Sequence, residues 1–169
     1  MKIVQERPGF VGPRNPSDMV AWAQGLTVTL LAWASEVGYR LNQSLAIDNA
    51  TRTIGLTIDG SGAAITAGVK GYVTVPFRGR ITGWSVIADQ VGSIVIDVWS
   101  DKFGNFPPTI ADTITGSEKP TLASEQIAKL ESVTDWDDQV TAGDVIAFNV
   151  KPTPSGVTRV TLTLTVQPS

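Results

Sequence analysis

The regular alternation of apolar and polar residues in the second half of the chain constrains its fold more than any other feature. It is cleanest near the C-terminus, in the run VTLTLTV at residues 160–166. Because successive side chains of a β-strand point to opposite faces, a period of two predicts a strand with one buried face. Four earlier runs alternate in the same way: GYVTVPF, ITGWSVIAD, SIVIDVWS and AGDVIAFNV.

The segments between these runs predict how the strands connect. They are short and rich in glycine, proline and aspartate, which is typical of turns: RGR, DQVG, FGNFPP, TAGD and TPSG. No helical crossover of about 10–15 residues separates the runs, so nothing indicates a parallel sheet. The sequence predicts a mainly β fold, an antiparallel β-sandwich of jelly-roll type, over residues 51–169. The span 109–138 alternates weakly, and we expect a long excursion there with an edge strand near residues 119–124.

The alternation also predicts which side chains share one face of each strand. These sets are Val73, Val75 and Phe77; Trp84, Val86 and Ala88; Ile94, Ile96 and Val98; Ile146, Phe148 and Val150; and Val160, Leu162, Leu164 and Val166.

The period is different in residues 17–43, where apolar residues recur at steps of four and three. The residues at these steps are Met19, Ala23, Leu26, Leu30, Trp33 and Val37. This is the a/d spacing of a coiled coil, and we call these six residues the seam. A helix is expected over 17–43, with Ser17 as its N-cap. The run LTVTLLAW also fits a strand, because Thr and Val are poor helix formers.

The segment 1–50 is expected to serve attachment or oligomerisation. Residues 1–16 carry three prolines and fit an extended arm, and residues 43–70 fit a linker that becomes the first strand or two of the sandwich. Val20, Trp22 and Leu31 lie off the seam, so the predicted helix is apolar on more than one side. Such a helix must pack on its own domain, on copies of itself, or on a partner.

The composition excludes several classes of function. The chain has no cysteine and no histidine, which removes thiolate and imidazole metal sites and the common nucleophile–histidine pairs. Its 13 basic and 16 acidic residues give a net charge of −3, so a nucleic-acid partner is not expected. The most apolar run, GLTVTLLAWASEVGY, is shorter than the ~20 residues of a membrane span, and no secretory signal pattern opens the chain. We expect synthesis as a soluble cytoplasmic chain, without membrane insertion and without a cofactor.

Acidic loops provide two candidate chemistries. Asp135, Asp137 and Asp138 cluster within four residues, and Asp101 and Asn105 flank a glycine, so either group offers oxygen ligands to calcium. Two facing carboxylates would also suit glycoside hydrolysis. The simpler interpretation is that these residues form turns and remain solvated, with Trp136 as a core residue. We therefore predict neither a metal site nor an enzyme.

Aromatic residues offer a third candidate, a platform on which a sugar ring could stack. Its members would be Tyr72, Trp84, Trp99, Phe103, Phe106 and Trp136. Trp84 and Trp99 lie in predicted strands and fit the core better. Phe103 and Phe106 are expected to seal one end of the sandwich, which makes FGNFPP a structural loop. Lys70, Arg78 and Arg80 are expected at a solvated hairpin end.

Three phrases resemble β-sandwich domains of virion structural proteins in tailed bacteriophages. They are GRITGWSVIADQVGSIVIDVWSDKFGNFPPTIADTITGSEKPTL, DWDDQVTAGDVIAFNV and VTRVTLTLTV. The resemblance covers roughly residues 65–167, is most specific at NFPPT and the following Ala111–Ile114, and does not extend to residues 1–45. It implies a virion component of the head-fibre, decoration or tail-fibre type, with no catalytic residues to transfer.

Together these features predict a homotrimeric capsid decoration (cement) or head-fibre protein. Its N-terminal segment would dock on the major capsid protein or another virion protein, and its sandwich would be exposed. The alternative is a trimeric tail-fibre or receptor-binding module that recognises a glycan on the host surface. The sequence leaves open whether the helix or the sandwich makes the trimer contacts.

Overall fold

In the computed structural model, the described residues are 15–48 and 50–169. The chain divides into two compact units, Met1–Ile47 and Asp48–Ser169. Most of the predicted arm, residues 1–16, lies outside the described residues.

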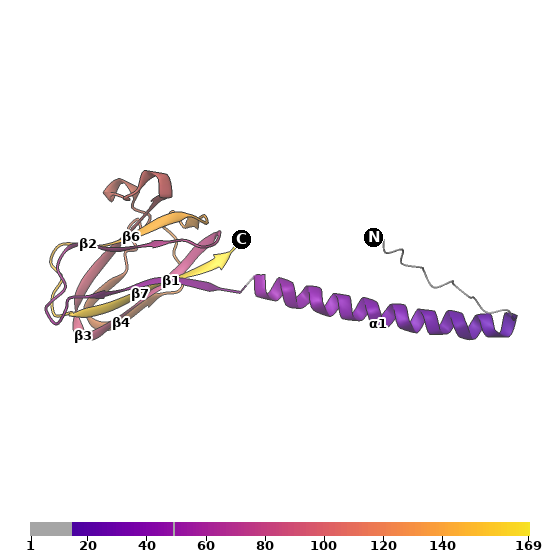
Figure 1. The fold of residues 1–169 in the computed structure, drawn as a ribbon. Helices are drawn as coiled ribbons and strands as arrows, with labels where there is room; N and C mark the ends of the chain where they lie inside the picture. Colours follow the sequence, from indigo (N-terminus) through magenta and orange to yellow (C-terminus); the bar gives the residue numbers. More distant parts are fainter. Residues whose placement is uncertain (1–14, 49) are drawn as a thin grey trace, which may run out of the picture. The chain divides into compact units, whose positions relative to one another are not determined.

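The first unit holds one long helix, α1, over Pro16–Asp48 (Figure 1). The alternative of a strand at LTVTLLAW is therefore wrong. The hydroxyls of Thr27 and Thr29 donate hydrogen bonds to the carbonyl oxygens of Ala23 and Gly25, at 2.8 and 2.9 Å. These two threonines thus satisfy their polar groups within the helix itself.

Both ends of α1 differ from the prediction. The N–H of Met19 donates to the carbonyl of Asn15 at 3.1 Å, and Pro16 is the first helical residue, where its missing N–H costs nothing. Ser17 therefore lies inside the helix and is not its N-cap. The helix also continues to Asp48 instead of ending near residue 43. Residues 43–48, which were expected to be the start of a linker, are therefore helical.

The second unit is an antiparallel β-structure, as predicted. Its strands are β1 (Arg52–Asp59), β2 (Gly68–Thr74), β3 (Gly79–Lys102), β4 (Thr121–Leu130), β5 (Gln139–Val140), β6 (Asp144–Val150) and β7 (Arg159–Pro168). β1 is the strand expected within residues 43–70, and β2 corresponds to the predicted run GYVTVPF but begins at Gly68 and ends at Thr74. The predicted edge strand near 119–124 is β4, which is longer and runs to Leu130.

β3 connects the two layers of the sandwich. Its first part pairs with β7, which pairs in turn with β1, and its last part pairs with β6, which pairs with β2. We call these groups the β1–β7 layer and the β2–β6 layer. β4 runs along the remaining edge of β3, and β5 pairs with Gly79 and Arg80.

The predicted turn DQVG does not separate two strands. β3 is continuous through it, and residues 88–91 bulge opposite the single β4 residue Gln126. The side chain of Gln126 donates to the carbonyl of Asp89 at 3.2 Å and bridges the bulge. The turn-forming residues therefore produce a bulge, because β4 pairs with β3 both before and after them.

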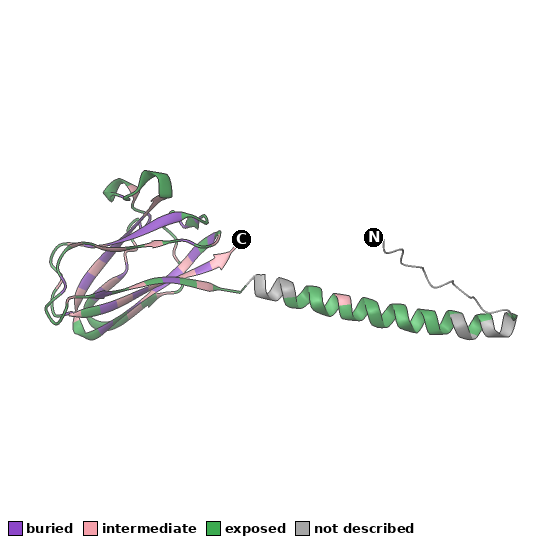
Figure 2. Ribbon diagram, viewed as in Figure 1, coloured by how far each residue is buried: buried purple, intermediate pink, exposed green. Residues whose placement is uncertain are grey.

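The core lies between the layers, on the faces that the alternation predicted (Figure 2). Val160, Leu162, Leu164 and Val166 are fully buried in β7, and the threonines between them are half-buried. Trp84, Val86 and Ala88 of β3 pair with Leu164, Leu162 and Val160 and share their face. In the last part of β3 the opposite face is buried as well, since Asp97 and Trp99 are also inaccessible to solvent.

The segment after β3 covers that second face. It contains two short 3-10 helices, η1 (Phe103–Asn105) and η2 (Ile110–Asp112). The ring of Phe106 contacts Tyr72 of β2, so this segment crosses over β6, the strand between β3 and β2. Beneath it, Trp99 of β3 and Val145 and Ala147 of β6 are buried.

Candidate functional site

The exposed surface of α1 is the strongest candidate for a functional site. Of the seam residues, Met19, Ala23, Leu26, Leu30 and Trp33 are exposed and Val37 is half-buried; Trp33 is 66% exposed. Val20, Val28 and Leu31, which lie off the seam, are also exposed. Apolar side chains therefore occupy more than one side of the helix.

The charge distribution along α1 strengthens this reading. No charged residue occurs from Met19 to Ser35. Glu36 and Arg40 follow and form an ion pair at 2.7 Å one turn apart. An uncharged helical surface of this length suits burial against protein better than contact with water. Within residues 15–48 and 50–169, no helix combines the length and the apolar character that a bilayer span requires.

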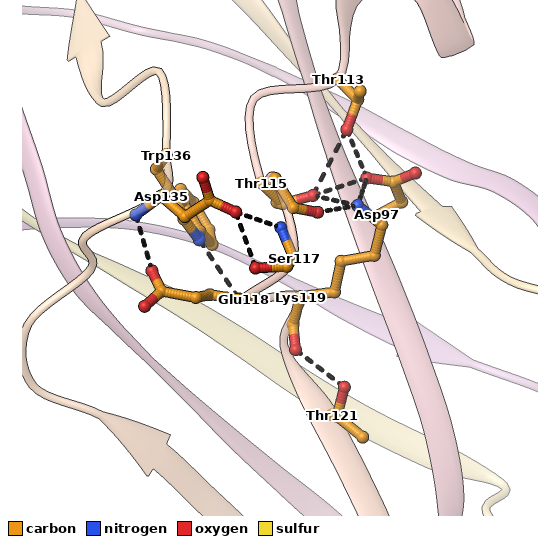
Figure 3. A network of polar contacts seen from close by, with 10 residues as sticks. Asp97, Thr113, Thr115, Ser117, Glu118, Lys119, Thr121, Asp135 and Trp136 are labelled. Carbon is orange, nitrogen blue, oxygen red and sulfur yellow. Dashed lines mark hydrogen bonds and ion pairs between the residues drawn. The ribbon is translucent and has the colours of Figure 1, made fainter.

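A polar network joins Asp97 of β3 to residues 113–119 of the segment that follows β3 (Figure 3). Asp97 of β3, whose side chain is 2% exposed, accepts hydrogen bonds from the hydroxyls of Thr113 and Thr115 at 2.6 and 2.7 Å. The ammonium group of Lys119 lies 3.3 Å from the same carboxylate oxygen. Burial by itself would raise the pKa of Asp97, but the two hydroxyls and the lysine outweigh it, so the pKa is lowered.

A second part of the network joins this segment to the loop before β5. The carboxylate of Asp135 accepts from the backbone N–H and the hydroxyl of Ser117, each at 2.7 Å. In return, the Glu118 carboxylate accepts from the N–H groups of Thr134 and Asp135, at 2.7 and 3.0 Å. The indole of Trp136 donates to the Glu118 carbonyl at 3.2 Å. The Thr134 and Ser117 donors lower the pKa values of Glu118 and Asp135, respectively.

Every carboxylate in this network accepts hydrogen bonds from the protein, so the network ties the segment after β3 to β3 and to the loop before β5. Sequence reasoning did not single out Asp97 or Glu118. For Asp97 a signal existed, because it interrupts the otherwise apolar strand SIVIDVWS. No pattern indicated Glu118, whose partners are 16 and 17 residues away in the sequence.

The predicted acidic cluster is not assembled into one site. Asp135 binds Ser117, Asp138 is buried and forms an ion pair with Arg80, and the Asp137 side chain is exposed. Among the described residues, no group of three or more potential ligands surrounds a common point. Asn105 donates to Asp101 at 3.0 Å within its own loop. The arrangement thus gives no support to a calcium site at the predicted cluster.

The aromatic residues divide into two groups. Trp84, Trp99 and Trp136 are buried, as predicted. Phe103 and Phe106 are 70% and 53% exposed, so the prediction that they seal one end of the sandwich is wrong. The buried residue of their loop is Pro108, which the sequence analysis did not distinguish. Phe106 instead packs edge-to-face on Tyr72, with ring centroids 4.8 Å apart.

The three basic residues expected at a hairpin end have different surroundings. Lys70 donates to the Thr66 hydroxyl at 2.9 Å, and Arg78 is exposed. Arg80 contacts the buried Asp138, so it anchors β5 to the start of β3 and is not only a solvated charge.

The chain matches no protein-family model, and no curated protein is significantly similar to it.

Proposed function

We propose that this protein is a non-catalytic structural component of a tailed-bacteriophage virion. It acts as a homotrimeric capsid decoration, cement or head-fibre protein that docks through its N-terminal segment on the major capsid protein or another virion protein. The observation that carries the proposal is the exposed, uncharged apolar surface of α1. The virion assignment is supported by the resemblance of residues 65–167 to phage sandwich domains.

The energetics favour association through α1. Burying a Leu or Val side chain is worth roughly 1.5–3 kcal/mol. Leu26, Leu30 and Trp33 follow one another along the seam and are 45%, 56% and 66% exposed. In a bundle of three helices every seam position is buried in each copy. The burial free energies of the seam residues therefore add up along each helix.

The mass of the full-length chain in solution tests the trimer. We expect three times the 17.9 kDa chain mass by light scattering. Leu30→Asp with Trp33→Asp should convert the trimer to monomer, because charges would be buried in the seam. Ser35→Asp is the matched control, since Ser35 lies on the same helix outside the seam and is exposed. A wild-type monomer at micromolar concentration would contradict the proposal.

Docking is a separate test. The wild-type chain should co-sediment with capsids that lack it. If the chain is a trimer but does not bind capsids, the proposed trimer stands and the proposed role in capsid decoration is contradicted.

A receptor-binding or tail-fibre module is the second candidate. It is favoured by the exposed aromatic pair Tyr72–Phe106 and by Phe103 beside it in sequence, since exposed aromatic rings can stack on sugars. A glycan array with the wild type and the Tyr72→Ala, Phe106→Ala double variant tests it. Binding of a glycan by the wild type alone would favour this candidate over capsid decoration.

A further inference from the structure

The outer face of the β1–β7 layer is a second exposed surface, and we call it the bare face. It comprises three rows of side chains that the strand register places side by side across β1, β7, β3 and β4. One row is Thr57, Thr161, Ile87 and Ile127; the next is Gly55, Thr163, Ser85 and Lys129; the third is Thr53, Thr165 and Gly83.

The bare face is almost uncharged. Lys129 is the one ionisable residue in its three rows, and it forms an ion pair with Glu131 at the edge of the layer. The ion pair between Arg159 and Asp59, at 2.8 Å, lies just beyond the row that begins with Thr57. A charged partner surface would therefore find no complementary charge at the centre of this face. A neutral partner surface would leave no charge buried without a partner there.

The apolar part of the bare face is a directly opposed pair, Ile87 on β3 and Ile127 on β4. They are 58% and 68% exposed and line a shallow groove with Ser85, Val86, Ala128 and Lys129. On the β2–β6 layer the chain covers the corresponding outer face with its own segment after β3. Within residues 50–169, no segment covers the bare face in this way.

The size of the bare face limits its partner. With strands about 4.8 Å apart and alternate residues about 6.8 Å apart, three rows on four strands cover roughly 350–400 Å². A stable interface between free partners needs about 800 Å² on each side. The bare face is too small to hold a free protein, but it suffices for a neighbour that is already held close.

The short connection between α1 and β1 would keep such a neighbour close. α1 ends at Asp48 and β1 begins at Arg52, so the connection spans at most about 14 Å even when fully extended. If three α1 helices associate in parallel, three sandwiches begin close to one axis. Short connections of this kind give millimolar effective concentrations, at which a small interface forms.

We propose that the bare face packs against the sandwich of a second copy of this chain within the trimer. This inference rests on the proposed function, because the trimer supplies the neighbour. It assigns trimer contacts to the sandwich in addition to the helix.

Single cysteines in the cysteine-free chain test the proposal. Ile127→Cys places a thiol on the bare face, and Ile110→Cys is the matched control, because Ile110 is 64% exposed on η2, away from this face. In full-length trimers, with each rate divided by that of the unfolded chain, we expect maleimide labelling at least tenfold slower at position 127 than at position 110.

Equal normalised rates in a chain that light scattering shows to be trimeric would overturn this inference and leave the proposed function standing. A monomeric chain would overturn both. Protection of position 127 only after capsids are added would also overturn it, since the face would then contact another virion protein.

A charge substitution gives an independent readout. Ile87→Glu with Ile127→Glu should raise the concentration at which trimers dissociate by at least tenfold, whereas Ile110→Glu should leave it unchanged. Circular dichroism establishes that each variant is folded. Should the double variant not fold, the cysteine labelling still decides, because it leaves Ile87 intact.

Discussion

Replacing Asp97 by alanine tests whether the buried network holds the segment after β3 in place. The substitution removes the acceptor of two hydroxyl hydrogen bonds, from Thr113 and Thr115, and the partner of Lys119. Hydrogen bonds to a charged group contribute about 1.5–3 kcal/mol each. Lys119 remains partly solvated and keeps the Gly116 carbonyl at 2.6 Å, so the loss of the ion pair adds little.

We therefore expect Asp97→Ala to lower the free energy of unfolding by about 3–5 kcal/mol. The assay is urea unfolding at pH 7 monitored by tryptophan fluorescence, with the slope of the transition unchanged. Asp137→Ala is the control, since that side chain is exposed, and its effect should stay within about 0.5 kcal/mol. An Asp97→Ala effect below about 1 kcal/mol would refute the idea that these contacts stabilise the fold.

The pH dependence provides a second check on the same residue. The pKa of Asp97 is lower in the folded state than its ordinary value of 3.8. The stabilisation from its ionised form is then fully present above pH 3.8 and is lost as the pH falls through the folded pKa. The stability difference between the wild type and Asp97→Ala should narrow under these acidic conditions; a difference that is constant down to pH 2 would contradict the electrostatic account.

Three further substitutions probe the fold by urea or thermal unfolding. Leu162→Ala removes a fully buried side chain and should cost about 2–5 kcal/mol; a loss below 1 kcal/mol would mean that the core collapses around it. Gly92→Ala should cost about 1–3 kcal/mol, because a Cβ there would lie closer than 3.0 Å to the carbonyl oxygen of Ser155; wild-type stability would show that the backbone yields at this point. Arg159→Ala breaks a solvent-exposed ion pair with Asp59 and should cost less than about 1 kcal/mol, whereas a larger loss would point to a packing role for its stem.

Local periodicity in the sequence was sufficient to predict most of the secondary structure and the inner faces of the strands. The alternation from Val160 to Val166 is sufficient to place four side chains in the core, because a strand has no other way to separate apolar from polar residues. The seam of α1 follows in the same way from its steps of four and three. Both features depend only on residues near one another in the chain.

The cover of an outer face depends on contacts between segments that are distant in the sequence. The segment after β3 buries Asp97 and Trp99 but leaves Phe103 and Phe106 exposed, which the composition of FGNFPP does not reveal. The bulge at residues 88–91 likewise depends on pairing with β4, more than 30 residues away in the sequence. A local pattern specifies which way a side chain points, whereas its burial depends on whether a distant segment has enough contacts to remain packed over it.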